Sequence, residues 1–181
     1  MFDYLSTSMK AAILVPPKDF KDESVSSLRT MLEKWGIEGV LTSYSTNELV
    51  GYHGAIYNVE LNSAKISPDE FDALILVDGK GVDEYRLYDF RQLLDLVKMF
   101  STRKKLIAGM GNALKIIARA NIISGVKIAP VKDEDTRRLV VLYHGVESKE
   151  DPEFDKGILT LGDNDKTLLF IDLLLRKLGA K

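Results

Sequence analysis

The chain has 181 residues, of which 45% are hydrophobic and 29% charged, a balance typical of a globular protein with a sizeable core. The formal net charge of -2 argues against a nucleic-acid surface, and no stretch approaches the roughly 18 consecutive apolar residues of a membrane helix. With no cysteine and only two histidines, His53 and His144, the chain has no disulfide, thiolate metal site or cysteine nucleophile, and we expect no metal centre.

The ends of the chain suggest a simple organisation. No basic segment followed by an apolar core opens the sequence, so we expect no signal peptide and a cytoplasmic location. We interpret residues 1–9 as an N-terminal leader and residues 10–181 as one domain, because no repeat, low-complexity tract or linker interrupts that range.

Short apolar runs alternate with segments of helical periodicity. Residues 11–15 are apolar on both faces and end at Pro16, which predicts a buried parallel strand. Residues 22–35 carry Val25, Leu28 and Leu32 at helical spacing. A strand at 39–45 is followed by a short strand or hairpin within 47–65. The later expected strands are at 73–77, 105–108, 126–129, 139–143 and 157–161, and the later expected helices at 85–101, 113–120 and 166–178. Asp163-Asn164-Asp165 is expected to cap the last helix.

This alternation predicts an α/β fold, a three-layer sandwich in which helices cover both faces of a mainly parallel central sheet. In such folds ligands bind at the carboxyl ends of the strands. The loops at residues 16–23, 77–81 and 109–113 are therefore the expected site.

The segment from Leu106 to Leu114 has the pattern of a nucleophile elbow, a sharp strand-to-helix turn with small residues around a strained tip. We predict Met110, which has a glycine on either side, at that tip. A thioether has no ionisable proton and cannot act as the usual activated nucleophile. Met110 then either fills space as an apolar side chain in a pocket that has lost its catalytic role, or acts as a redox-responsive thioether that is oxidised to the sulfoxide.

The chain resembles the ThiJ/PfpI superfamily of intracellular proteases, glyoxalases, deglycases and redox-sensing chaperones. Four segments carry the resemblance: residues 68–76, the bend at 106–114, residues 118–127, and Gly51-Tyr52-His53-Gly54, which is similar to the PfpI branch. The resemblance implies the flavodoxin-like fold of class I glutamine amidotransferases.

The family's catalytic residues are altered in this chain. The family's bend usually holds small residues, then Cys, often His, then Gly, and we match the last three to Met110, Gly111 and Asn112. The family's acidic residue falls on Glu23, or on Ser24 if the helix register shifts by one. The family's strand-end Gly-Gly becomes Asp78-Gly79, which brings a carboxylate to a backbone-donor position.

These changes predict a homologue without the nucleophilic cysteine, a non-catalytic protein that binds a small ligand or is chaperone-like or regulatory. The alternative is a cysteine-independent hydrolase or lyase in which Glu23 or Asp78 acts as general base on water. No cofactor is expected, since Gly109-Met110-Gly111 lacks the third glycine of a dinucleotide fingerprint. The resemblance implies a homo-oligomer, for which residues 85–88 are a suitable surface. The expected pocket comprises Glu23, Ser24, Asp78, Gly79, Met110, Gly111 and Asn112.

Overall fold

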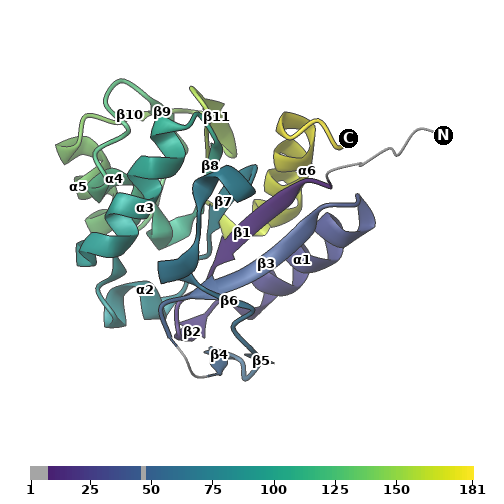
Figure 1. Cartoon of the computed structure of the whole chain (residues 1–181). Coiled ribbons are helices and arrows are strands. Elements are labelled where there is room, and N and C mark those ends of the chain that lie inside the picture. The colour runs from purple at the N-terminus through teal and green to yellow at the C-terminus, as the bar shows by residue number, and fades with distance from the viewer. Residues whose placement is uncertain (1–7, 46–47) are drawn as a thin grey trace.

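The computed structural model describes residues 8–45 and 48–181, so most of the expected leader, residues 1–7, lies outside the described residues. Its main sheet has the strand order β11-β12-β8-β7-β1-β3-β6 (Figure 1), and all neighbours are parallel except β11 and β12. The strands are β1 (Lys10–Leu14), β3 (Glu38–Ser43), β6 (Leu61–Asn62), β7 (Ala73–Leu76), β8 (Leu106–Met110), β11 (Glu153–Asp155) and β12 (Ile158–Leu161).

Two small sheets lie outside the main one. The first joins β2 (Lys18–Phe20), β4 (Leu49–Gly51) and β5 (Ile56–Tyr57), and it contains the expected hairpin because β4 and β5 are antiparallel. The second pairs β9 (Lys127–Ile128) with β10 (Val146–Glu147). The expected strand at 126–129 therefore forms, but it belongs to the second small sheet.

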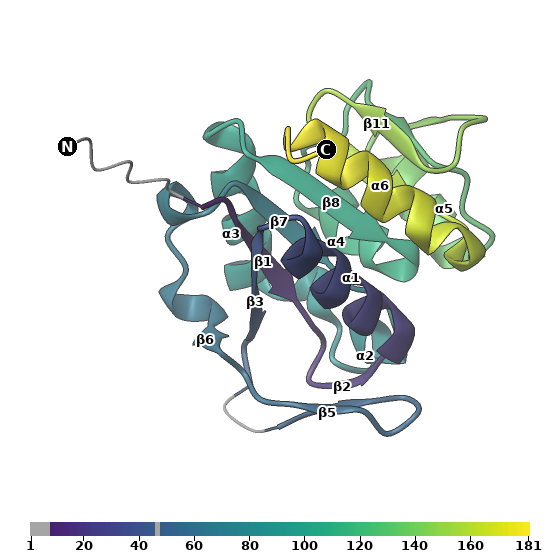
Figure 2. The same ribbon diagram turned by 90° about the vertical axis from the view of Figure 1, so that its right-hand side faces the viewer.

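Helices cover both faces of the main sheet, which confirms the flavodoxin-like α/β fold. Figure 2 shows α1 (Asp22–Lys34) and α6 (Thr167–Lys177) side by side on one face. On the other face lie α3 (Arg91–Thr102) and α4 (Leu114–Arg119), with α5 (Glu134–Leu142) packed on α4. The short α2 (Lys80–Glu84) follows β7. The 3₁₀ turns are η1 (Ser63–Lys65), η2 (Pro68–Glu70), η3 (Leu87–Asp89), η4 (Gly111–Ala113) and η5 (Asn164–Lys166).

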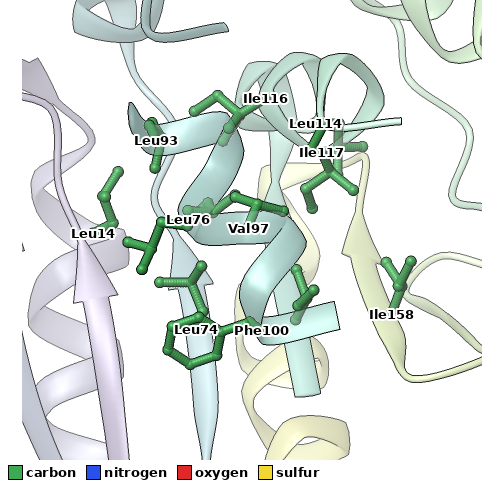
Figure 3. Packing of buried hydrophobic residues seen from close by; sticks show 14 of the residues in the cluster. Leu14, Leu74, Leu76, Leu93, Val97, Phe100, Leu114, Ile116, Ile117 and Ile158 are labelled. Carbon is green, nitrogen blue, oxygen red and sulfur yellow. The ribbon is translucent and has the colours of Figure 1, made fainter. Parts of the chain in front are cut away.

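The core is divided between the two faces because side chains alternate along each strand. In β1, Ala12 and Leu14 face α3 and α4, whereas Ala11 and Ile13 face α1 and α6. Figure 3 shows the first of these clusters, in which Leu14, Leu74 and Leu76 lie near Leu93, Val97 and Phe100 of α3 and Ile117 of α4. These two apolar layers hold the strands in one register, so the loops at their carboxyl ends have fixed positions.

The expected strand at 139–143 is wrong, because these residues lie in and just after α5. Asp133 caps this helix by accepting a hydrogen bond from the Thr136 N–H, and Glu134 and Asp135 place negative charge in its first turn. These helix-start signals outweigh the strand propensity of the Leu139–Leu142 run, of which Val140 is buried and Leu142 exposed.

Two helix predictions also need correction at their ends. The helix expected at 85–101 begins only at Arg91, because Arg86 adopts a left-handed backbone with φ 47° and η3 intervenes. The expected cap at 163–165 is not the cap of α6: Lys166 precedes α6, while the Asp163 carboxylate accepts the Asp165 N–H at 3.0 Å.

Candidate functional site

The bend between β8 and α4 has Gly111 at its tip. Met110 is extended, with φ -120° and ψ 132°, and ends β8, whereas Gly111 has φ 51° in the left-handed region that favours glycine. Met110 is 0% exposed and pairs with Leu161 of β12. The expectation of Met110 at the tip was therefore wrong by one residue. The signal in the sequence was the second glycine, which is the residue that tolerates the bend.

A carboxylate fills the space beside this tip. A Cβ atom built on Gly111 would lie 3.0 Å from Asp78 Oδ2 and 3.2 Å from Asp78 Cβ. Asp78 follows β7, the strand next to β8, and is only 4% exposed. A side chain at the tip would therefore require the Asp78 side chain to shift by a few tenths of an ångström.

The first turn of α1 supplies a partner for this carboxylate. Ser24 Oγ donates a hydrogen bond to Asp78 Oδ1 at 3.2 Å, and Ser24 is fully buried. Glu23, the alternative acidic position, is exposed on the neighbouring cavity wall. Of the two positions, Ser24 is therefore the one directed at the bend, because its helix register faces the sheet.

Asn112 occupies both polar backbone groups of Gly79. The Gly79 N–H donates to Asn112 Oδ1 at 3.1 Å, and Asn112 Nδ2 donates to the Gly79 carbonyl at 2.7 Å. Asn112 Nδ2 also contacts Asp83 Oδ2 at 3.2 Å. A backbone donor that could stabilise an oxyanion is thus already hydrogen-bonded within the protein.

Close packing of two loops fixes the position of Gly79. Its φ is 144°, and a Cβ atom there would lie 2.3 Å from the carbonyl oxygen of Asp19 in β2. Only glycine allows the two segments to approach so closely. At the floor of the site, β2 therefore packs directly against the segment that follows β7.

A cavity of about 1000 Å³ opens above this floor. Loops from the carboxyl ends of four neighbouring strands, β1, β7, β8 and β12, contribute to its wall, as expected for an open α/β sheet. Of the expected pocket residues, Glu23, Asp78, Gly79, Gly111 and Asn112 line it. Ser24 and Met110 are not part of the lining and lie buried beneath it.

Carboxylates outnumber ammonium groups on the cavity wall. Three lysines line it, namely Lys21, Lys80 and Lys132. Seven carboxylates line it, namely Asp19, Glu23, Asp78, Asp83, Asp133, Asp163 and Asp165. Five of these residues lie in the loops that were expected to form the site: Asp19, Lys21, Glu23, Asp78 and Lys80. The other five were not expected there, because they come from segments far away in the sequence: Asp83, Lys132, Asp133, Asp163 and Asp165.

Two of these carboxylates, Asp83 and Asp133, are held by a buried lysine. Lys115 Nζ lies 2.8 Å from Asp83 Oδ1 and 3.8 Å from Asp133 Oδ2. Burial opposes the charged form of Lys115, but the hydrogen bond and charge of Asp83, with the charge of Asp133, outweigh it and raise the pKa of the lysine. Lys115 therefore stays protonated and joins α2, α4 and the start of α5.

The hairpin tip at Tyr52 and His53 forms one rim of the cavity. The two rings meet edge to face with centroids 5.0 Å apart, and the Lys80 ammonium lies 4.6 Å from the Tyr52 ring centroid. Asp22 holds this tip by accepting the His53 and Ala55 N–H groups at 2.8 and 2.9 Å. Partial burial would raise the pKa of Asp22, but these hydrogen bonds prevail and lower it.

The described residues lack both a metal-binding cluster and a membrane-spanning helix. Within residues 8–45 and 48–181, no group of three or more His, Asp or Glu side chains is placed to hold a metal ion. In the same residues, no helix has the length and apolar character needed to span a bilayer.

The fold and this bend agree with a known family. The model of the DJ-1/PfpI family matches residues 9–151, and the chain therefore belongs to the DJ-1/PfpI family. A ThiJ/PfpI domain protein from Brachyspira murdochii has the same fold, with a TM-score of 0.88 over 95% of this chain and 97% of that chain at 21% identity.

Several relatives with detectable sequence similarity come from archaea. An uncharacterized protein of Methanocaldococcus jannaschii is 30% identical over 158 residues, 85% of this chain and 72% of that protein. A deglycase of Thermococcus kodakarensis is 32% identical over 66% of this chain and 70% of its own length. The deglycase PfpI of Pyrococcus furiosus is 25% identical over 64% of this chain and 68% of its own length.

Proposed function

We propose that this protein is a non-catalytic member of the DJ-1/PfpI family that binds a small ligand in the cavity above Gly111. The observation that carries the proposal is the residue at the bend. The family's usual order of Cys, His and Gly after small residues fits Gly111, Asn112 and Ala113 once Gly111 is the tip. A glycine there has no nucleophile, and no cysteine elsewhere in the chain can replace it.

The surroundings of the bend support loss of the chemistry. The family's acidic position fits Ser24, whose hydroxyl is hydrogen-bonded to Asp78. Asp78 occupies the space into which a side chain at position 111 would extend. The Gly79 N–H, which a developing oxyanion would need, donates to Asn112 instead. The positions of the nucleophile and its acidic partner therefore hold Gly111 and Ser24, and one backbone donor is already hydrogen-bonded to Asn112.

Activity assays test this proposal directly. We expect no deglycase, glyoxalase or peptidase turnover above the uncatalysed rate, with the deglycase PfpI of Pyrococcus furiosus as positive control. A cysteine-independent hydrolase or lyase would instead show turnover that Glu23→Gln or Asp78→Asn abolishes and Glu33→Gln leaves intact. That result would establish the alternative and overturn the proposal.

A further inference from the structure

The polarity of the cavity indicates which ligands it can accept. Besides Asp83 and Asp133, which pair with Lys115, the wall carries five carboxylates and three lysines. One of the lysines, Lys80, is already placed over the Tyr52 ring. The wall therefore has a net negative charge, which favours a cation over an anion.

The floor of the cavity has the same preference. Asp78 brings a carboxylate to the tip of the bend, and the Gly79 N–H is occupied by Asn112 Oδ1 at 3.1 Å. An anionic group at this point would lie beside Asp78 without that donor. An ammonium group, by contrast, would be attracted by the negative charge of the Asp78 carboxylate, which also accepts the Ser24 hydroxyl.

The distribution of the carboxylates distinguishes an organic cation from a metal ion. Metal ligands converge on one point within about 2–2.6 Å of the ion, and the described residues hold no such group of three. The cavity carboxylates instead follow separate strands across a volume of about 1000 Å³, from Asp19 after β1 to Asp163 after β12. The rim adds the Tyr52 ring, whose face already accepts an ammonium group, that of Lys80.

We propose, on the basis of the ligand-binding function above, that the cavity binds an extended organic cation with several amino groups, of the linear polyamine class. Its ammonium groups pair with separate carboxylates while its methylene segments lie along the wall. Because the attraction is electrostatic, binding weakens as the salt concentration rises.

Calorimetric titration with spermidine at about 50 mM salt tests this inference, where charges are screened over roughly 14 Å. We expect saturable binding with one site per chain, weakened at least tenfold in Glu23→Gln/Asp165→Asn. These two side chains are exposed, so the fold should persist, as thermal unfolding will verify. The matched control is Glu33→Gln/Glu70→Gln, which removes the same charge from exposed positions outside the cavity and should change binding less than twofold.

Three results overturn the inference. They are no binding of spermidine, equal weakening by the control pair, and saturable binding of inorganic phosphate in place of spermidine. Phosphate binding would still agree with a ligand-binding protein. Turnover in the activity assays, measured on the same preparation, would instead overturn the proposed function whatever the titration shows.

Discussion

Gly111 shows how a single backbone conformation defines the site. A left-handed φ of 51° costs a residue with a Cβ about 1 kcal/mol or more, and here a Cβ would also press on Asp78. The sequence correctly predicted a sharp strand-to-helix turn between Leu106 and Leu114, but a glycine at the tip adopts this φ without strain. The choice of Met110 as the tip was wrong because β8 continues through Gly109 to Met110, two residues beyond the expected end of the strand at 108.

The absence of cysteine makes an introduced thiol a clean probe of this bend. We expect Met110→Cys to react with Ellman's reagent only on unfolding, because position 110 is fully buried in β8. Gly111→Cys/Asp78→Gly should react in the native state, because position 111 lines the cavity and loss of the Asp78 side chain makes room. Native-state reactivity of Met110→Cys, with Gly111→Cys/Asp78→Gly protected, would contradict this assignment of the tip.

The elements that position the site could be predicted from the sequence wherever strand and helix signals did not compete in the same segment. The runs that became β1, β7, β8 and β12 are buried on both faces and could be recognised as parallel strands. The run at 139–143 was ambiguous because its β-branched residues follow a strong helix start at Asp133. Contacts between separate elements, such as Asp22 with the β4–β5 hairpin, have no local signal.

That contact predicts a pH-dependent stability. The folded-state pKa of Asp22 is lowered from 3.8, so its contribution is present above the unfolded pKa and is lost as pH falls through the folded pKa. We expect Asp22→Asn to reduce the free energy of unfolding by about 1 kcal/mol at pH 7, and to differ progressively less from the wild type below about pH 3.8.

Urea unfolding across pH 2–7 measures this difference, and amide exchange at His53 and Ala55 localises it to the hairpin. Glu33→Gln, an exposed change further along α1, serves as the control. A difference that stays constant down to the lowest pH, or unchanged exchange at His53, would show that Asp22 does not hold the hairpin.

The ion pair between Lys115 and Asp83 predicts that removing the carboxylate and removing the ammonium group destabilise the fold by different amounts. Asp83→Asn leaves a buried ammonium with only the more distant Asp133, whereas Lys115→Met leaves two half-exposed carboxylates that water can solvate. We therefore expect Asp83→Asn to destabilise the fold by about 1–2 kcal/mol and Lys115→Met by less than about 1 kcal/mol. Urea unfolding at pH 7 compares them, and the reverse order would contradict the argument.

At the scale of the whole molecule, the alternation of strands and helices predicted the sandwich and the resemblance implied its flavodoxin-like form, but residue patterns alone could not give the strand order. The full charge composition of the cavity was also beyond sequence reasoning, because its charged residues follow β1, β7, β9 and β12, which are far apart in the sequence. The cavity wall is thus acidic although the net charge of the whole chain is only -2. Net charge is therefore a poor guide to the ligand of this protein.

Self-association, which the family resemblance implies, stays a prediction for the molecule as a whole. Of the expected surface, Tyr85 is 45% exposed and the Arg86 side chain is also exposed, while Leu87 is buried. We expect light scattering coupled to size exclusion to give a mass of at least twice 20.3 kDa, and Tyr85→Ser to shift it toward the monomer. Leu169→Ser on α6 removes a comparably exposed apolar side chain and should leave the mass unchanged. A wild-type mass of 20.3 kDa at all concentrations, or dissociation by Leu169→Ser alone, would refute this surface.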